Sequence, residues 1–468
     1  MAEAQLVERL RAFLQELKPE ARSLLIAELE KSLLRGEETP GAELVLQELR
    51  RSMRETSKPA PRGGSLSRLF FQPLEPFLVD DEPVHKHPGR IARGALDPIW
   101  QWICRDLMPG EAKAVTEEVA RAYAEDDAAK AEQLARGFQD RAILRIAEAQ
   151  ATASRDEKTL RKLAAQIGTP RAIDDITAIC AVIGARDRLS SLGKRMQGHI
   201  RNLADHQLDL VKRLLENSKL TEPSLFVYAL VLVMGRLAAP WQLIRLAIRA
   251  AGSDQAAKVA ETPYAPSVAI VLAEIERTIR ELRAELRSGR GVATGALLKS
   301  IHDAARGLRT ELELSVESPW GRRLADLRAQ ISELLTTEIE SMPGRVRRQL
   351  RPRSDKEVTP GMTLDSNEVK ETETLLEFVG SCRIYAGELA VSEVTQRAYT
   401  ELQQYLDTTT RTLIDGLRGA SEPVRAFRQS QFHAAVQFCG KMFGPEYASL
   451  LLKAAEVATG AERKLARA

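Results

Sequence analysis

Cysteine is scarce in this chain, and its placement excludes two classes of protein. Four cysteines occur among 468 residues, and no two of them form a Cys-x-x-Cys pair. A disulfide-stapled secreted scaffold and a cysteine-rich zinc module both need closely spaced cysteines. The scattered thiols instead predict small buried side chains in a protein of a reducing compartment.

Long apolar runs are missing as well. The longest, from Leu225 to Gly235, spans 11 residues before Arg236 ends it. A helix needs roughly 20 apolar residues to cross a bilayer, so no transmembrane segment is expected. The chain carries acidic side chains from Glu3 onward, unlike the basic start of a secretory signal. These features predict a cytoplasmic protein.

Neither sign of charge dominates, and the usual catalytic signatures are absent. The chain has 68 Lys and Arg residues against 65 Asp and Glu residues, a net charge of +3. Binding to nucleic acid or to an anionic surface would therefore need a local basic patch. The sequence contains no HExxH, no G-x-S-x-G and no phosphate-loop motif. It favours a protein that is not an enzyme, although distant residues can assemble an active site, and it predicts no cofactor.

The residues that are abundant favour helices. Aromatic residues make up only 5% of the chain, while Ala, Leu, Arg and Glu dominate. The clearest periodicity is a heptad-like seam with spacings of 4, 3, 4, 3 and 4 at Val268, Leu272, Ile275, Ile279, Leu282 and Leu286. We therefore predict an all-α fold. It would be a multi-helix array of antiparallel helical hairpins and bundles with coiled-coil-like seams and little or no β-structure.

Stretches rich in proline, glycine and charge divide the chain into parts. We expect an N-terminal helical module (1–56), a flexible linker (57–68), a central helical domain that begins with a Pro- and aromatic-rich loop (69–260), a heptad-patterned antiparallel bundle (261–342), a basic-then-acidic linker (343–367) and a C-terminal helical unit (368–468).

The segment LFFQPLEPFLVDDEPVHKHPGR, from Leu69 to Arg90, differs from the helical remainder. In an extended segment the side chains of His85 and His87 point the same way. Together with Asp81 they would offer three ligands to zinc, manganese or iron. The interpretation that we favour is a clasp: the aromatic residues bury the segment against a helical core, and its charges stay in water.

A second candidate site is a run of arginines. Five of them fall within nine residues, at Arg345, Arg347, Arg348, Arg351 and Arg353. Such a run neutralises phosphates without reading sequence, and its binding weakens with salt. The acidic residues that follow can pair with it instead, and a solvated linker is the favoured interpretation.

The sequence thus predicts a non-catalytic cytosolic scaffold or adaptor that docks protein partners on helix faces, with self-association as an option. Two alternatives stay open. One is a protein that binds nucleic acid or an anionic surface through Arg345 to Arg353. The other is a metal-dependent enzyme that uses Asp81, His85 and His87.

Overall fold

The computed structural model of the chain describes Val45 and residues 65–80, 87–169, 171–196, 198–288, 294–353, 357–359, 361–417 and 422–465. Within these ranges the fold is essentially all-α, as the sequence predicts. The only strands in the same ranges are β1 (Leu78–Val79) and β2 (Ile91–Ala92), which pair in parallel. No helix in the described ranges is both long and apolar enough to cross a membrane.

The chain forms two compact units. Of the described residues, the first contains Val45, 65–72 and 100–151. Its described helices are α4 (Leu66–Phe71), η3 (Ile103–Leu107), α6 (Pro109–Ala124) and most of α7 (Ala128–Ala153). The ring of Phe70 lies 5.4 Å from that of Trp100 and 5.8 Å from that of Phe138. The buried Gln139 donates a hydrogen bond to the main-chain oxygen of Phe70 at 2.8 Å, which ties α7 to the end of α4.

The second unit contains the described residues within 73–99 and 152–465. Its first segment begins within η1 (Gln72–Phe77), contains both strands and η2 (Arg93–Ala95), and ends within α5 (Leu96–Trp102). Its further helices are α8 (Glu157–Ile167), α9 (Ala172–Gly184), α10 (Arg186–Arg195), α11 (Asp205–Glu216), α12 (Pro223–Met234), η4 (Pro240–Leu243), α13 (Ile244–Ala251), α14 (Ala256–Ala260), α15 (Pro266–Ser288), α16 (Thr294–Glu311), α17 (Pro319–Leu350), α18 (Ser366–Tyr385), α19 (Ser392–Leu417), α20 (Glu422–Phe443) and α21 (Pro445–Leu465).

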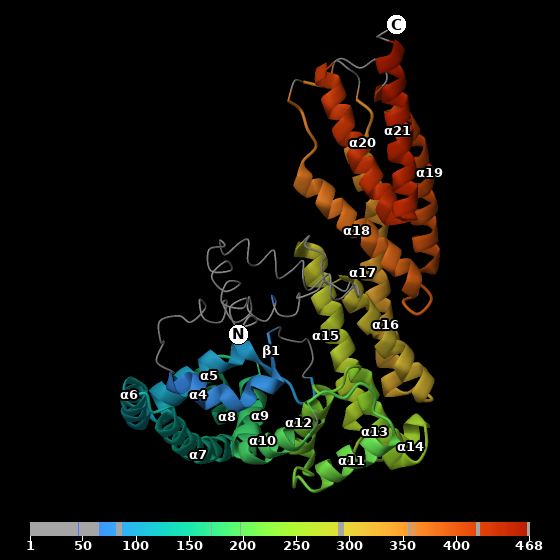
Figure 1. The fold of residues 1–468 in the computed structure, drawn as a ribbon. Helices are drawn as coiled ribbons and strands as arrows, with labels where there is room; N and C mark the ends of the chain where they lie inside the picture. The colour runs from blue at the N-terminus through green and yellow to red at the C-terminus, as the bar shows by residue number, and fades with distance from the viewer. Residues whose placement is uncertain are drawn as a thin grey trace, which may run out of the picture. The chain divides into compact units, whose positions relative to one another are not determined.

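The α15 helix is central to the second unit. It packs against α16 and α17, and also against α12, α13 and η4 (Figure 1). Five of the six predicted seam residues on α15 are buried: Val268, Leu272, Ile275, Ile279 and Leu282. The local apolar period therefore identified the packed face of this helix correctly. Coiled-coil packing of that face stays a prediction.

The α17 helix is longer than the sequence suggests. It begins as expected: the Ser318 side chain accepts a hydrogen bond from the Gly321 N–H, and Pro319 occupies the first turn. It then continues through Pro343 to Leu350, so the basic stretch starts in a helix and not in a linker. Burial of Met342, Val346 and Leu350 carries the apolar face forward at four-residue spacing and offsets the hydrogen bond that Pro343 removes.

The helices after α17 pack together at the C-terminal end of the second unit. The α18, α19 and α20 helices pack on one another and on α17, and α21 packs on α19 and α20 (Figure 1). Phe378, Phe427 and Phe438 are almost fully buried in these helices. The α21 helix is much less covered: among its described side chains, Ala455 is the one that is buried.

The stretch that was expected to open the central domain as a loop is helical from Leu69 to Phe77 and continues into β1. Leu69 to Phe71 end α4, and residues 72–77 form the 3-10 helix η1. Its large apolar side chains are buried, with Phe70 at 0% and Phe77 at 1% exposure. The prolines of this segment fit the short 3-10 turn because their φ angle is already fixed near the helical value.

Candidate functional site

A tight turn before β2 directs two polar side chains, His87 and Arg90, toward α15. Gly89 adopts a left-handed conformation with φ of +67°. A Cβ atom at this position would lie 2.7 Å from Cγ2 of Val231 and 2.9 Å from the main-chain oxygen of Val227. Only glycine fits this close approach to α12, so the turn holds both side chains in place.

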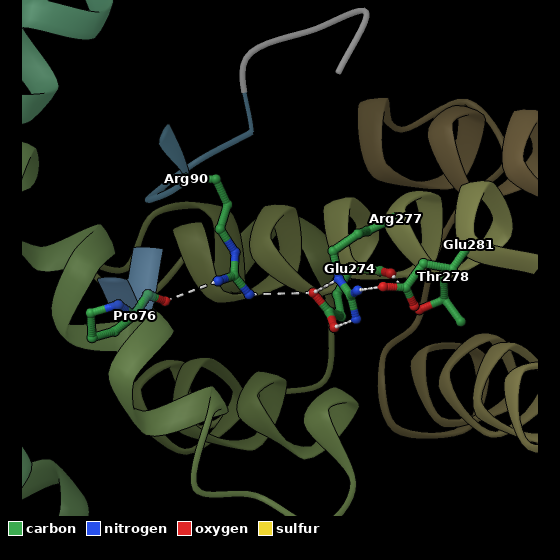
Figure 2. A network of polar contacts seen from close by, with 6 residues as sticks. All are labelled: Pro76, Arg90, Glu274, Arg277, Thr278 and Glu281. Atoms are coloured by element: carbon green, nitrogen blue, oxygen red, sulfur yellow. Dashed lines mark hydrogen bonds and ion pairs between the residues drawn. The ribbon is translucent and has the colours of Figure 1, made fainter. Parts of the chain in front are cut away.

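Arg90 joins the first of two charge clusters on α15 (Figure 2). Its guanidinium donates to the main-chain oxygen of Pro76 at 3.2 Å and to Oε2 of Glu274 at 3.4 Å. Arg277 donates to both carboxylate oxygens of Glu274, at 2.6 and 3.1 Å, and also to Glu281. Two guanidinium groups and two carboxylates thus form a balanced network.

The electrostatics of this network keep Glu274 ionised. Burial opposes ionisation of this carboxyl group, but the hydrogen bonds and charges of Arg277 and Arg90 outweigh burial and hold the pKa of Glu274 below its ordinary value. A general acid or base at neutral pH needs a pKa near the working pH. Glu274 is therefore a structural anion and a poor candidate for proton transfer.

His87 belongs to the second cluster, centred on Glu276. Its Nε2 atom lies 2.9 Å from Oε2 of Glu276, and Nη2 of Arg323 donates to the same oxygen at 2.5 Å. His87 and Glu276 are 5% and 10% exposed, whereas the Arg323 side chain is 29% exposed. This cluster is therefore buried on the His87 side and reaches solvent along α17.

Burial also sets the protonation state of this second cluster. It lowers the pKa of His87, although the hydrogen bond to Glu276 raises it, and the charges of Arg280 and Arg323 lower it further. Burial raises the pKa of Glu276, but the hydrogen bonds to His87 and Arg323 outweigh burial, so the pKa lies below its ordinary value. At neutral pH we therefore assign a neutral imidazole that donates to an ionised carboxylate.

The structure describes only one of the three residues of the predicted metal site, His87. Asp81 and His85 lie outside the described residues, and His87 directs Nε2 to Glu276. Across the described ranges, no group of three His, Cys, Asp or Glu side chains is placed to hold a metal ion. The metal hypothesis for Asp81, His85 and His87 stays a prediction.

A cavity of about 220 Å³ borders the first cluster. It lies between η4, α15 and α16, and much of its wall consists of small apolar side chains and Trp241. Its polar lining includes Glu274 from α15 and the pair formed by Lys299 and Asp303, whose Nζ and Oδ2 atoms are 2.5 Å apart. Since cations already neutralise both carboxylates, the cavity offers space and shape more than reactive groups.

The predicted arginine run is partly occupied by contacts within the chain. Arg347 donates to Oε1 of Glu401 at 2.5 Å, and its guanidinium lies 5.6 Å from the ring of Tyr405. Arg353 lies 5.2 Å from the ring of Phe427. These two arginines thus help to join the end of α17 to α19 and α20.

The other three arginines of the run lie in different surroundings. Arg345 lines a cavity of about 20 Å³ together with Glu285 and Glu371. Arg348 and Arg351 are exposed and form no ion pair with the described residues. Arg347 and Arg353 thus have partners within the chain, and phosphate binding by Arg345, Arg347, Arg348, Arg351 and Arg353 stays a prediction.

No pattern in the sequence indicates that α15 buries charge. Glu276 and Arg280 stand among many charged residues of a heptad-patterned helix. The partner of Glu276 is His87, which is 189 positions away, so no local pattern reveals the contact. The spacing of Glu276 and Arg280, four positions apart, is a weak signal that they share a face.

None of the protein-family models, curated proteins or solved structures compared with this chain matches it. A functional conclusion therefore depends on the site itself. The carboxylates of Glu274 and Glu276 are hydrogen-bonded to cations, which hold their pKa values below the ordinary value.

Proposed function

We propose that this chain is a non-catalytic α-helical scaffold of the cytoplasm that binds a protein partner through the exposed face of α21. Paired carboxylates in the α15 clusters support a non-catalytic role. The observation that carries the proposal is the incomplete burial of α21. Leu450 is 64% exposed and Leu452 is 40% exposed in a helix that packs against α19 and α20, and at two-residue spacing their side chains lie on different sides of that helix.

Exposed leucines on a helix are a common means of association between helical proteins. Burying one leucine side chain stabilises a complex by roughly 1.5–3 kcal/mol. One leucine that enters an apolar groove would therefore change affinity by about tenfold or more, at about 1.4 kcal/mol per factor of ten. A second copy of this chain is one partner that fits, since its own α21 presents the same face.

The experiment compares the wild type with Leu450→Glu/Leu452→Glu and with a matched control. Leu144→Glu is that control, because Leu144 on α7 is 65% exposed and so receives the same charge at similar exposure. Each tagged full-length chain is used to recover partners from the source lysate, and its mass is measured over a range of concentrations.

The proposal predicts a stoichiometric protein, or a second copy of the chain, bound to the wild type and to the control. The double variant should recover at least tenfold less. Equal recovery by all three chains would refute α21 as the docking face, and so would a wild type that stays monomeric with no stoichiometric partner.

A further inference from the structure

Arg280 on α15 is the least explained charged group in the described structure. The three nitrogens of its guanidinium are all buried, and none has a hydrogen-bond partner within the described part of the chain. A guanidinium carries five N–H donors and cannot lose its proton in a protein. It therefore cannot escape the cost of burial by becoming neutral, as a lysine or a histidine does.

The surroundings of Arg280 make this charge harder to account for. Arg280 is one helical turn beyond Glu276, and it is close enough to His87 to lower the pKa of the imidazole. Glu276 is already engaged by His87 and Arg323. With His87 neutral, this cluster has two guanidinium groups and one carboxylate among the described residues, and so an excess of one positive charge. The neighbouring network around Glu274 is balanced by comparison.

We propose that Arg280, with Arg323, forms a binding site for a small oxyanion, such as a phosphate or carboxylate group. The planar fork of a guanidinium binds two oxygens of such a group with parallel hydrogen bonds. An oxyanion would supply both the missing acceptors and the missing negative charge. It would reach the site along α17, where Arg323 is partly exposed. This site is on α15 and α17 and does not depend on docking at α21.

The test is a titration of the full-length chain with sodium phosphate or sodium acetate at constant ionic strength, held with sodium chloride. The thermal midpoint is followed, and binding to the wild type is measured directly by calorimetry. We expect one site per chain and a midpoint that rises with the bound anion. A response to phosphate or to acetate identifies the class of oxyanion.

Two variants locate the binding. Arg280→Met should bind at least tenfold more weakly, and without the oxyanion it should be no less stable than the wild type, because it removes an unpaired buried cation. Arg322→Met removes the same charge from an exposed position of α17 and should respond as the wild type does.

The proposal is overturned if calorimetry shows no binding of either anion to the wild type, a result that does not depend on the folding of any variant. It is also overturned if Arg280→Met responds as strongly as the wild type. Should Arg280→Met fail to fold, Arg280→Lys keeps the charge but loses the fork, and it must still show at least tenfold weaker binding.

Discussion

Replacing Gly307 with alanine should destabilise α16, although the same change usually stabilises a helix. Gly307 is buried in the interior of α16, directly beneath the indole of Trp241. A Cβ atom at this position would lie 2.5 Å from both Cδ2 and Cε3 of the indole. The ring has little freedom to move, because Arg245 lies 5.2 Å above it and donates to Glu311 at 2.7 Å.

The magnitude follows from two opposing contributions. Alanine is favoured over glycine inside a helix by about 1 kcal/mol. Carbon atoms in contact are normally about 3.5–4.0 Å apart, so the new methyl group would overlap two ring atoms by about 1 Å. Overpacking of this kind typically costs about 1–3 kcal/mol. The net result is a destabilisation of Gly307→Ala by up to about 2 kcal/mol.

Gly344→Ala is the matched control, because Gly344 lies inside α17 and a Cβ atom there meets nothing within 4 Å. It should stabilise its helix by about 0.5–1 kcal/mol. Native-state hydrogen exchange of α16 and α17 peptides measures both effects locally, since a chain of this size need not unfold in one step. Trp241→Leu should remove the penalty when it is combined with Gly307→Ala. The reasoning is wrong if Gly307→Ala is as stabilising as the control, or if the double variant shows no coupling.

Three further predictions concern single groups. Because the folded pKa of His87 lies below 6.5, its contribution to stability is complete above about pH 6.5 and is lost as the pH falls from there through the folded pKa. His87→Gln should therefore weaken the pH dependence of the urea midpoint between pH 7.5 and 5.5. An unchanged pH dependence in this variant would contradict the assignment. Gln431 donates to two main-chain oxygens at the end of α17, at 3.0 and 3.1 Å. Gln431→Ala should therefore lower the free energy of local opening there by about 2 kcal/mol, measured as faster hydrogen exchange. A change below about 0.5 kcal/mol would exclude this capping role. Burial raises the pKa of Cys180, Cys382 and Cys439 to about 12, so alkylation followed by mass spectrometry should leave these thiols unmodified at pH 8 until the chain is denatured.

The helical part of the fold could be predicted because its signals are local. The seam from Val268 to Leu282 is visible within a few turns, and so is the start of α17 at Ser318 and Pro319. The two strands have no signal in the sequence, because two residues cannot display a period. The extension of α17 past Pro343 depends on burial by later helices, which outweighs the local preference of proline.

The candidate sites were harder to predict, because their contacts join distant parts of the chain. The sequence singles out His87, but as a metal ligand together with Asp81 and His85. Its partner in the structure, Glu276, lies on a helix whose charges all resemble solvated surface residues. Sequence can show that a charged residue lies on a helix, but the tertiary contact decides whether that charge is buried.

The two charge clusters on α15 differ in their balance of charge. The Glu274 cluster contains equal numbers of guanidinium and carboxylate groups, as a purely structural network should. The Glu276 cluster has an excess of positive charge, and an apolar side chain of similar volume at Arg280 would be at least as stable. Stability alone therefore does not account for Arg280, whereas an oxyanion does. The proposals for Arg280 and for α21 rest on different helices, so a failed titration with phosphate would leave the docking of a partner at Leu450 untouched.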